Sequence, residues 1–110
     1  MKLMVLSAVH NVMGGRRYVY KFFCQRMQHI QKRFGVETLV VGSEGWDSKG
    51  VTEKYGLHYR EHPNNPVSDK WNFGMSVMKQ DKFNPDYVMI LGSDDLVSDS
   101  LIEFYLKVIE

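Results

Sequence analysis

The sequence predicts an α/β domain built on a mainly parallel β-sheet with helices on both faces. Four short apolar runs alternate along the chain with four longer segments whose apolar residues recur at helical spacing. Such β-α-β-α alternation is typical of parallel sheets wrapped by helices. The 110 residues, of which 44% are hydrophobic and 25% charged, suffice for one domain with one modest core.

The first part of the chain is expected to form two strands joined by a long helix. Residues 2–9 (KLMVLSAV) are an apolar run followed by polar residues, as in a first strand. Two glycines at 14 and 15 break the chain, and a helix then runs to about Phe34, where Gly35 provides a stop. The second strand is expected over residues 36–43 (VETLVVGS). The apolar face of the helix is expected to contain Val19, Phe22, Phe23, Met27, Ile30 and Phe34.

The middle of the chain is more polar. Residues 46–56 indicate a short helix that Gly50 weakens. Residues 57–62 (LHYREH) alternate between apolar and polar side chains, which indicates a strand with one face in water at an edge of the sheet. A turn cluster, PNNP at 63–66, precedes a helix from Pro66 to about Met78. One side of that helix carries Trp71, Met75 and Met78.

The last part of the chain is expected to form a strand and a helix. Residues 86–92 (DYVMILG) are almost continuously apolar, which predicts a central strand. Ser98 or Asp99 then caps a helix over residues 100–110. Because this helix is still amphipathic in its last residues and lacks a capping signal there, we expect a chain truncated at its C-terminus.

The apolarity of the four strands predicts their order in the sheet. The first, second and fourth are expected inside and the polar third at an edge. This gives the order 3-2-1-4 of a Rossmann-like three-layer sandwich, which is half of a doubly wound sheet. Ligands of such sheets bind beyond the carboxyl ends of the strands where the order reverses, here between the first and the fourth. The loops at that point are residues 7–11 (SAVHN) and 92–97 (GSDDLV).

Asp94 and Asp95 are therefore expected at this crevice. Adjacent carboxylates repel each other and are costly to remove from water unless a positive charge lies between them. Two oxygen ligands at a strand end suit Mg²⁺ or Mn²⁺, with diphosphate oxygens and waters completing an octahedron. We therefore expect the pair to bind a divalent cation. In the alternative, Asp94 caps a turn and Asp95 is solvated, because Asp is common in turns after strands.

The start of the third helix is rich in polar groups. Lys70 and Asn72 lie in its first turns, where free backbone N–H groups and the helix dipole favour an anion. Gly74 lowers helix propensity, which indicates close approach by a strand or a ligand. The alternative is an ordinary capped helix with a solvated lysine and a glycine required for packing.

Composition argues against several functional classes. The formal net charge of +1 predicts no nucleic-acid-binding surface, and no apolar run approaches the roughly 20 residues of a membrane span. The single Cys24 excludes an internal disulfide, fits the reducing cytoplasm and is expected in the core. No Walker loop or Gly-x-Gly-x-x-Gly element follows the first strand, and the four histidines are not expected to form a zinc site.

Taken together, four blocks of the sequence resemble the N-terminal half of family 2 glycosyltransferases with the GT-A fold. These blocks are SAVHN after the first strand, VVGSEGWDSKG after the second, VSDKWNFGM at the third helix and YVMILGSDDLVS at the fourth strand. By this resemblance, the base of a nucleotide-diphospho-sugar donor contacts Ala8, Val9, His10, Asn11, Ser43 and Glu44. The family's Arg-Asn-x-Gly element appears here as Trp71, Asn72, Phe73 and Gly74, with Lys70 as the adjacent cation. Its Asp-x-Asp element falls on Gly92, Ser93 and Asp94.

The resemblance implies transfer of a sugar from this donor to an unknown acceptor. A Mn²⁺ or Mg²⁺ ion held by Asp94 and Asp95 would neutralise charge on the departing diphosphate, and Ser93 and Asn72 would orient the donor. Because Gly92 replaces the first acid of the Asp-x-Asp element, the two aspartates must hold the ion together. In the family, the catalytic base and the acceptor site follow this element in the chain, so we assign no catalytic residue and expect donor binding alone.

Two other functions remain open. A nucleotidyltransferase would share the sheet, and VMGGRR at 12–17 is a faint form of its glycine-rich basic loop. A non-catalytic α/β module that binds a partner would show no metal dependence and would expose an apolar patch. A homodimer could form through such a patch.

Overall fold

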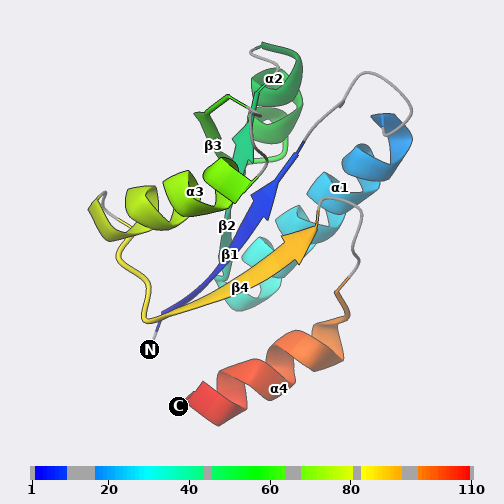
Figure 1. The fold of residues 1–110 in the computed structure, drawn as a ribbon. Coiled ribbons are helices and arrows are strands. Elements are labelled where there is room, and N and C mark those ends of the chain that lie inside the picture. The colour runs from blue at the N-terminus through cyan, green and yellow to red at the C-terminus, as the bar shows by residue number, and fades with distance from the viewer. Residues whose placement is uncertain are drawn as a thin grey trace.

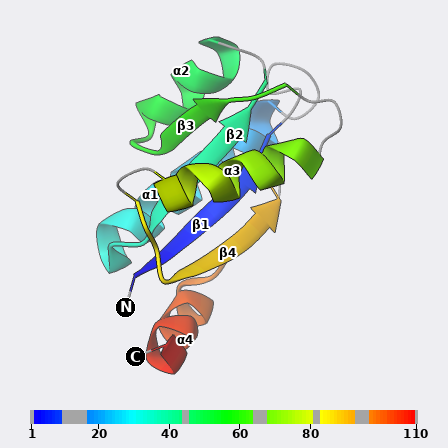
Figure 2. The ribbon, with the colours of Figure 1, turned by 60° about the vertical axis from the view of Figure 1, so that its left-hand side comes forward.

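The computed structural model describes residues 2–9, 17–43, 46–63, 68–80, 83–92 and 97–109. These residues form a four-stranded, all-parallel sheet between two layers of helices (Figures 1 and 2). The strands are β1 (Leu3–Ala8), β2 (Glu37–Gly42), β3 (His58–Glu61) and β4 (Tyr87–Gly92). The helices are α1 (Arg17–Phe34), α2 (Trp46–Lys54), α3 (Ser68–Gln80) and α4 (Asp99–Ile109). The sheet order β3-β2-β1-β4 confirms the predicted fold class and strand order.

Two clusters of buried side chains hold the helices to the two faces of the sheet. The larger cluster contains Val5 of β1, Phe23 of α1 and Ile102 of α4, and side chains of α2 pack against it. The smaller cluster joins Leu6 of β1 to Met78 of α3. The helices α1, α2 and α4 therefore lie on one face and α3 on the other, as Figure 2 shows for α1 and α3.

The central strand β1 contributes to both clusters. Leu3 and Val5 belong to the cluster on the α1 face, and Met4 and Leu6 belong to the cluster on the α3 face. The most exposed of the four, Leu3, is only 7% exposed. A parallel strand covered on both faces must be apolar throughout, which explains the unbroken apolar run near the start of the chain.

Local signals set the helix ends where the sequence predicts them. Gly35 has a φ of 71°, a left-handed conformation that suits glycine, and its N–H donates to the carbonyl of Gln31 at 2.9 Å to end α1. At the start of α4, the N–H of Leu101 donates to Oγ of Ser98 at 3.1 Å, so Ser98 is the cap. The expected bounds of all eight elements are confirmed to within two residues.

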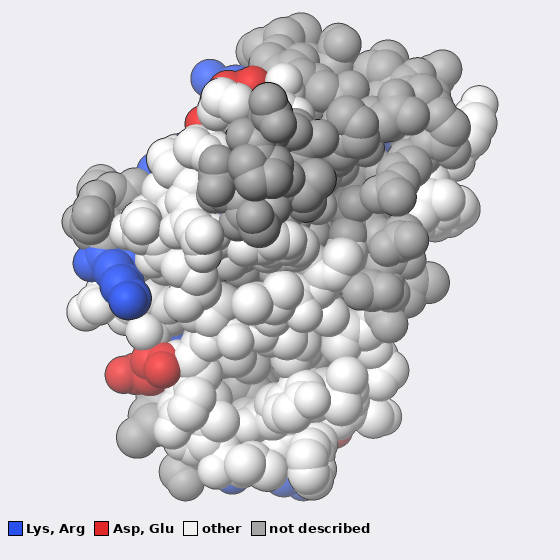
Figure 3. Space-filling model, in the orientation of Figure 1, with Lys and Arg blue, Asp and Glu red and all other residues white. Residues whose placement is uncertain are grey.

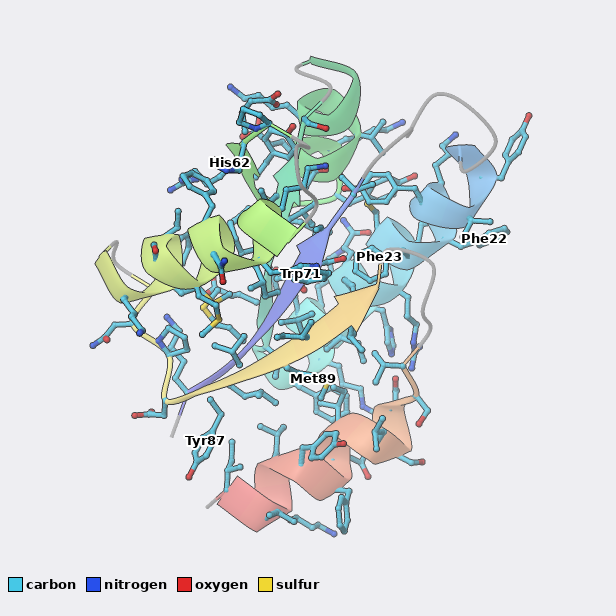
Figure 4. All side chains as sticks on the ribbon, in the orientation of Figure 1. Phe22, Phe23, His62, Trp71, Tyr87 and Met89 are labelled. Carbon is cyan, nitrogen blue, oxygen red and sulfur yellow. The ribbon has the colours of Figure 1, made fainter. Side chains whose placement is uncertain are left out.

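Two expectations about exposure are wrong. β4 is not central, because it forms an edge of the described sheet with Tyr87 and Ile90 exposed by 45% and 58%. Ile90 shares with Val88 the face of the sheet on which α3 lies, but α3 packs over β1 and β2 and leaves Ile90 exposed. On α1, Val19 and Phe22 are exposed by 43% and 63%, whereas Phe23 is buried (Figure 4). The buried stripe of this helix is therefore narrower than its apolar pattern predicts.

Gly74 allows α3 to approach the sheet closely. A Cβ atom at this position would lie 2.5 Å from Cδ1 of Leu6 and 3.2 Å from Cγ2 of Val41, and both of these side chains are fully buried. The predicted approach by a strand is therefore confirmed. The same core contains Trp71, Met75 and Met78, as expected.

We expect Gly74→Val to lower the free energy of unfolding by about 1–3 kcal/mol more than Ser76→Val does, because the added side chain would displace Leu6 and Val41. Ser76 is a matched control, since it is exposed on the same helix and receives the same β-branched side chain. Urea denaturation of the two variants measures the difference. Equal losses would show that α3 does not lie this close to the strands.

A cluster of charged side chains around Asp99 attaches α4 to α1. The carboxylate of Asp99 accepts hydrogen bonds from Arg26, Arg33 and His29, the last from Nε2 at 3.0 Å. Nε of Arg26 also donates to the carbonyl of Val97 at 2.7 Å. The hydrogen bond from His29, reinforced by that from Arg26, holds the pKa of Asp99 below its usual value against an opposing effect of burial.

Asp99 should therefore contribute to stability in a pH-dependent way. Because its pKa is lower in the folded chain, the carboxylate stabilises that chain above the unfolded pKa of about 3.9, and the contribution is lost as pH falls through the folded value. We expect Asp99→Asn to be less stable than the wild type near neutral pH, with the difference shrinking below about pH 4. Urea denaturation across this range tests it, with Glu53→Gln as the control for loss of an exposed negative charge. A difference in stability between the wild type and Asp99→Asn that does not change with pH would contradict a role for the charge of Asp99.

Candidate functional site

The carboxyl ends of β1 and β4 lie side by side at the point where the strand order reverses. Ala8 and Gly92, the last residues of these strands, are paired in the sheet. On its other side β1 pairs with β2, where Ala8 lies opposite Val41. Figure 1 shows the ends of β1 and β4 together on one side of the sheet. Doubly wound sheets bind their ligands beyond strand ends of this kind.

Lys70 places a buried ammonium group at this end of the sheet. It is the third residue of α3, is 1% exposed, and donates from Nζ to the carbonyl oxygen of Val9 at 2.7 Å. The alternative of a solvated lysine is therefore wrong. Burying an ammonium group is costly unless polar or anionic groups compensate it. The positive end of the α3 dipole lies at the same place, because Lys70 is in the first turn of the helix.

Three residues that the resemblance assigns to the donor lie at these neighbouring strand ends. Ala8 ends β1, Val9 follows it, and Ser43 follows β2. The N–H of Val9 donates to the carbonyl of Val41 at 2.9 Å, which ties the end of β1 to the end of β2. The structure therefore brings Ala8, Val9 and Ser43 to the end of the sheet where Lys70 is buried.

Asn72 lies on a different side of α3. Its side chain is exposed, and it follows Lys70 by two positions, which turns it about 200° around an α-helix. Because Lys70 contacts the residue after β1, Asn72 points away from that strand end. The structure does not bring Asn72 together with Lys70 and Val9.

The other predicted site residues lie outside the part of the chain that the structure describes. They are His10, Asn11, Glu44, Ser93, Asp94 and Asp95. Residues 12–16 of the faint glycine-rich loop lie outside it as well. In sequence, the two aspartates follow Gly92, which ends the strand beside β1. Among the described residues, no group of three or more His, Cys, Asp or Glu side chains could hold a metal ion.

An aromatic pair at the same end of the sheet is not predicted by the sequence. His62 follows β3 and donates its N–H to the carbonyl of Gly42 at 2.8 Å. Its ring stacks on Phe73 of α3, with centroids 4.5 Å apart and planes inclined by 14°; Figure 4 labels His62 beside this helix. Phe73 follows Lys70 by three positions and so lies on the same side of α3. This places a half-buried aromatic surface on the side of α3 that carries the ammonium group.

Polar side chains on the face of the sheet that α1 covers belong to the core. Tyr20 and Thr52 share a hydrogen bond between their hydroxyl groups, and burial raises the pKa of Tyr20 well above its usual value. Burial also raises the pKa of Cys24 to about 12, so its thiol stays protonated and weakly reactive. The expectation that Cys24 is a core residue is confirmed. Ser7 is fully buried, and its Oγ has no hydrogen-bond partner within the described part of the chain.

Comparisons of the chain with models of protein families, with curated proteins and with solved structures found no significant match. Conclusions about function therefore depend on the geometry described above. Within the ranges that the structure describes, no helix is long and apolar enough to cross a membrane.

The Lys70→Met variant removes the ammonium group but keeps an unbranched apolar side chain. It therefore tests the contribution of the charge apart from that of packing. We expect this variant to lose about 1–3 kcal/mol of unfolding free energy, because the buried carbonyl of Val9 loses its charged donor. Lys79→Met is the matched control, an exposed lysine in the last turn of the same helix, with an expected change within about 0.5 kcal/mol. Urea denaturation compares them, and a Lys70→Met variant as stable as the control would show that the contact with Val9 contributes nothing.

Proposed function

We propose that this chain is the nucleotide-diphospho-sugar-binding domain of a glycosyltransferase. The observation that carries the proposal is the buried ammonium group of Lys70 at the carboxyl end of β1. It lies at the topological switch point, where α/β sheets bind nucleotides and related ligands. A diphosphate is the part of such a donor that a buried cation and a helix N-terminus would stabilise.

The donor's nucleoside would lie across the ends of β1 and β2. Ala8, Val9 and Ser43 are at these ends, and His10, Asn11 and Glu44 follow them in sequence. The flat surface of His62 and Phe73 supports this arrangement, because planar rings of ligands stack on aromatic side chains. Ser93 would contribute to orienting the donor from the end of β4, and Asn72 would require contacts on the exposed side of α3.

Asp94 and Asp95 would hold a Mn²⁺ or Mg²⁺ ion against the diphosphate. Carboxylate oxygens are suitable ligands for these hard cations. Asp94 and Asp95 are consecutive in sequence and follow β4, the strand that pairs with β1. When bound, the ion would supply Lewis-acid stabilisation of the leaving diphosphate. Lys70 would add a fixed positive charge on the β1 side of the same group.

The proposal assigns donor binding to these residues and leaves the acceptor and the catalytic base unassigned. In the glycosyltransferases that this sequence resembles, both follow the Asp-x-Asp element. The protonated, buried thiol of Cys24 suits the reducing cytoplasm, where we place the protein. The formal net charge of +1 offers no basis for nucleic acid as a partner.

Isothermal titration of UDP and of GDP into the wild type, with Mn²⁺ and with EDTA, tests this function. We expect binding of one nucleotide that requires Mn²⁺, and Asp94→Asn should weaken it by at least about tenfold through loss of a charged ligand. Lys70→Met should also weaken it, whereas the exposed Lys79→Met should not. Binding unaffected by EDTA would remove the role of the aspartates, and no binding by folded protein would overturn the proposal.

A second candidate function is a non-catalytic α/β module that binds a protein partner. The observation that favours it is the number of large apolar side chains on the surface, among them Tyr18, Phe22, Ile90 and Phe104. This function predicts that neither nucleotide nor Mn²⁺ changes the thermal midpoint of the protein. The titration described above therefore separates the two candidates.

A further inference from the structure

The strand β4 forms an edge of the described sheet, and alternate backbone polar groups along it point outward. The N–H of Tyr87 donates to the carbonyl of Lys2 at 3.0 Å, so Tyr87 directs its backbone groups toward β1. In a parallel pair of strands this direction alternates from one residue to the next. The N–H and C=O groups of Val88 and Ile90 therefore point away from β1, on a side where no other strand of the described ranges pairs with β4.

β4 has none of the features that keep an edge strand from pairing with another protein. Its six residues, YVMILG, include no charged residue and no proline, and its register with β1 is continuous from Tyr87 to Gly92. Figure 3 shows the surface over β4 and α4 as almost entirely uncharged. Outward-pointing backbone groups on an apolar edge are a template for a further strand.

The helix α4 has an apolar flank that its attachment to the domain does not use. Its other flank faces α1, because Asp99 and Glu103 accept hydrogen bonds from Arg33. Leu101 lies about 200° around the helix from Glu103, and so on the flank away from α1. The residues of this apolar flank are Leu101, Tyr105 and Val108, which are exposed by 40%, 38% and 63%.

This apolar flank lies on the side of β4 where a fifth strand would pair. Figures 1 and 2 both place α4 past the edge of the sheet at β4, on the side away from β1. Ile102 of α4 packs in the same cluster as Met89 and Leu91 of β4. On the other face of the sheet, α3 packs over β1 and β2 and leaves Ile90 58% exposed. A fifth strand would therefore have one face against α4 and the other face in water.

We propose that β4 binds an extended segment of a partner protein as a fifth strand of the sheet. The segment has apolar side chains at alternate positions, turned toward α4, and polar side chains between them, turned toward water beside Ile90. Backbone hydrogen bonds to Val88 and Ile90 hold the segment, and the apolar flank of α4 selects its apolar residues. This inference is independent of the proposed donor site, because it uses the outer side of β4 and not the carboxyl ends of the strands.

The edge strands of this chain do not have the required pattern, which is why we assign the segment to a different protein. β4 is apolar on both faces, so a second copy of it would leave one apolar face in water. β3 (HYRE) has polar or charged side chains on both faces, so it would place a charge against α4 or leave α4 uncovered. A segment that is apolar on one face only fits better than either of them.

Amide hydrogen exchange of the ¹⁵N-labelled protein, followed by NMR with an added peptide, tests this proposal. The probe is the capped peptide KTVTITVTK, and its control is KTTVVITTK, which has the same composition without the alternation. In the free protein, the amides of Val88 and Ile90 should exchange at least about tenfold faster than that of Met89, which faces β1. The probe should slow exchange at Val88 and Ile90 by at least about threefold and leave Met89 unchanged, whereas the control peptide should have no effect.

A pair of variants tests the role of the apolar flank of α4. Leu101→Gln should weaken binding of the probe by at least about fivefold, because it places a polar group against the apolar side chains of the peptide. Lys107→Gln, at an exposed position of the same helix, is the matched control and should bind the probe as the wild type does. Circular dichroism verifies that both variants are folded.

Three results would overturn the proposal. The first is exchange at Val88 and Ile90 that the probe does not slow at up to about 2 mM, a concentration that allows for weak binding of a single strand. The second is equal slowing by the two peptides, because such binding would not depend on alternating apolar residues. The third is protection of both amides in the free protein. Protection that rises with protein concentration would assign the edge to a second copy, and protection that does not would assign it to the chain itself.

Discussion

The burial of β1 on both faces is the constraint on which the rest of the structure depends. Its alternating side chains supply both hydrophobic clusters, so α1 and α3 must lie on opposite faces of the sheet. Strands on both sides of β1 complete its backbone hydrogen bonds. The three layers, the strand order and the point where that order reverses all follow from covering this one strand.

The same constraint determines how a charged group can be buried at the carboxyl end of β1. α3 lies close to β1 because Gly74 leaves room for Leu6 and Val41. That closeness places Lys70, one helical turn earlier, within 2.7 Å of the carbonyl after β1. Packing in the core and the electrostatics of the strand ends are therefore linked through one helix. Phe73 lies on this helix too, so a single element supplies both the predicted Lys70 and an aromatic ring that sequence reasoning did not foresee.

The elements could be predicted from the sequence because their signals are local. The apolar run of β1, the glycine that ends α1 and the serine that caps α4 each act within a few residues. The Lys70–Val9 contact joins residues 61 positions apart, and the His29–Asp99 contact joins residues 70 apart, so spacing contains no sign of either. β4 was expected to be central because an apolar run looks the same whether one or two strands pair with it. The exposure of Ile90 depends on where α3 packs on the sheet, and the apolar sequence of β4 does not predict that position.

The two edges of the sheet differ in polarity. β3 is short and carries His58, Arg60 and Glu61, the kind of polar edge that resists pairing with other proteins. β4 is longer and has no charged side chain, and α4 beside its start adds a second apolar surface. The candidate site lies at the carboxyl ends of the strands, whereas Tyr87 and the end of α4 lie toward their amino ends. The apolar surface of Tyr87 and α4 therefore lies away from the candidate site.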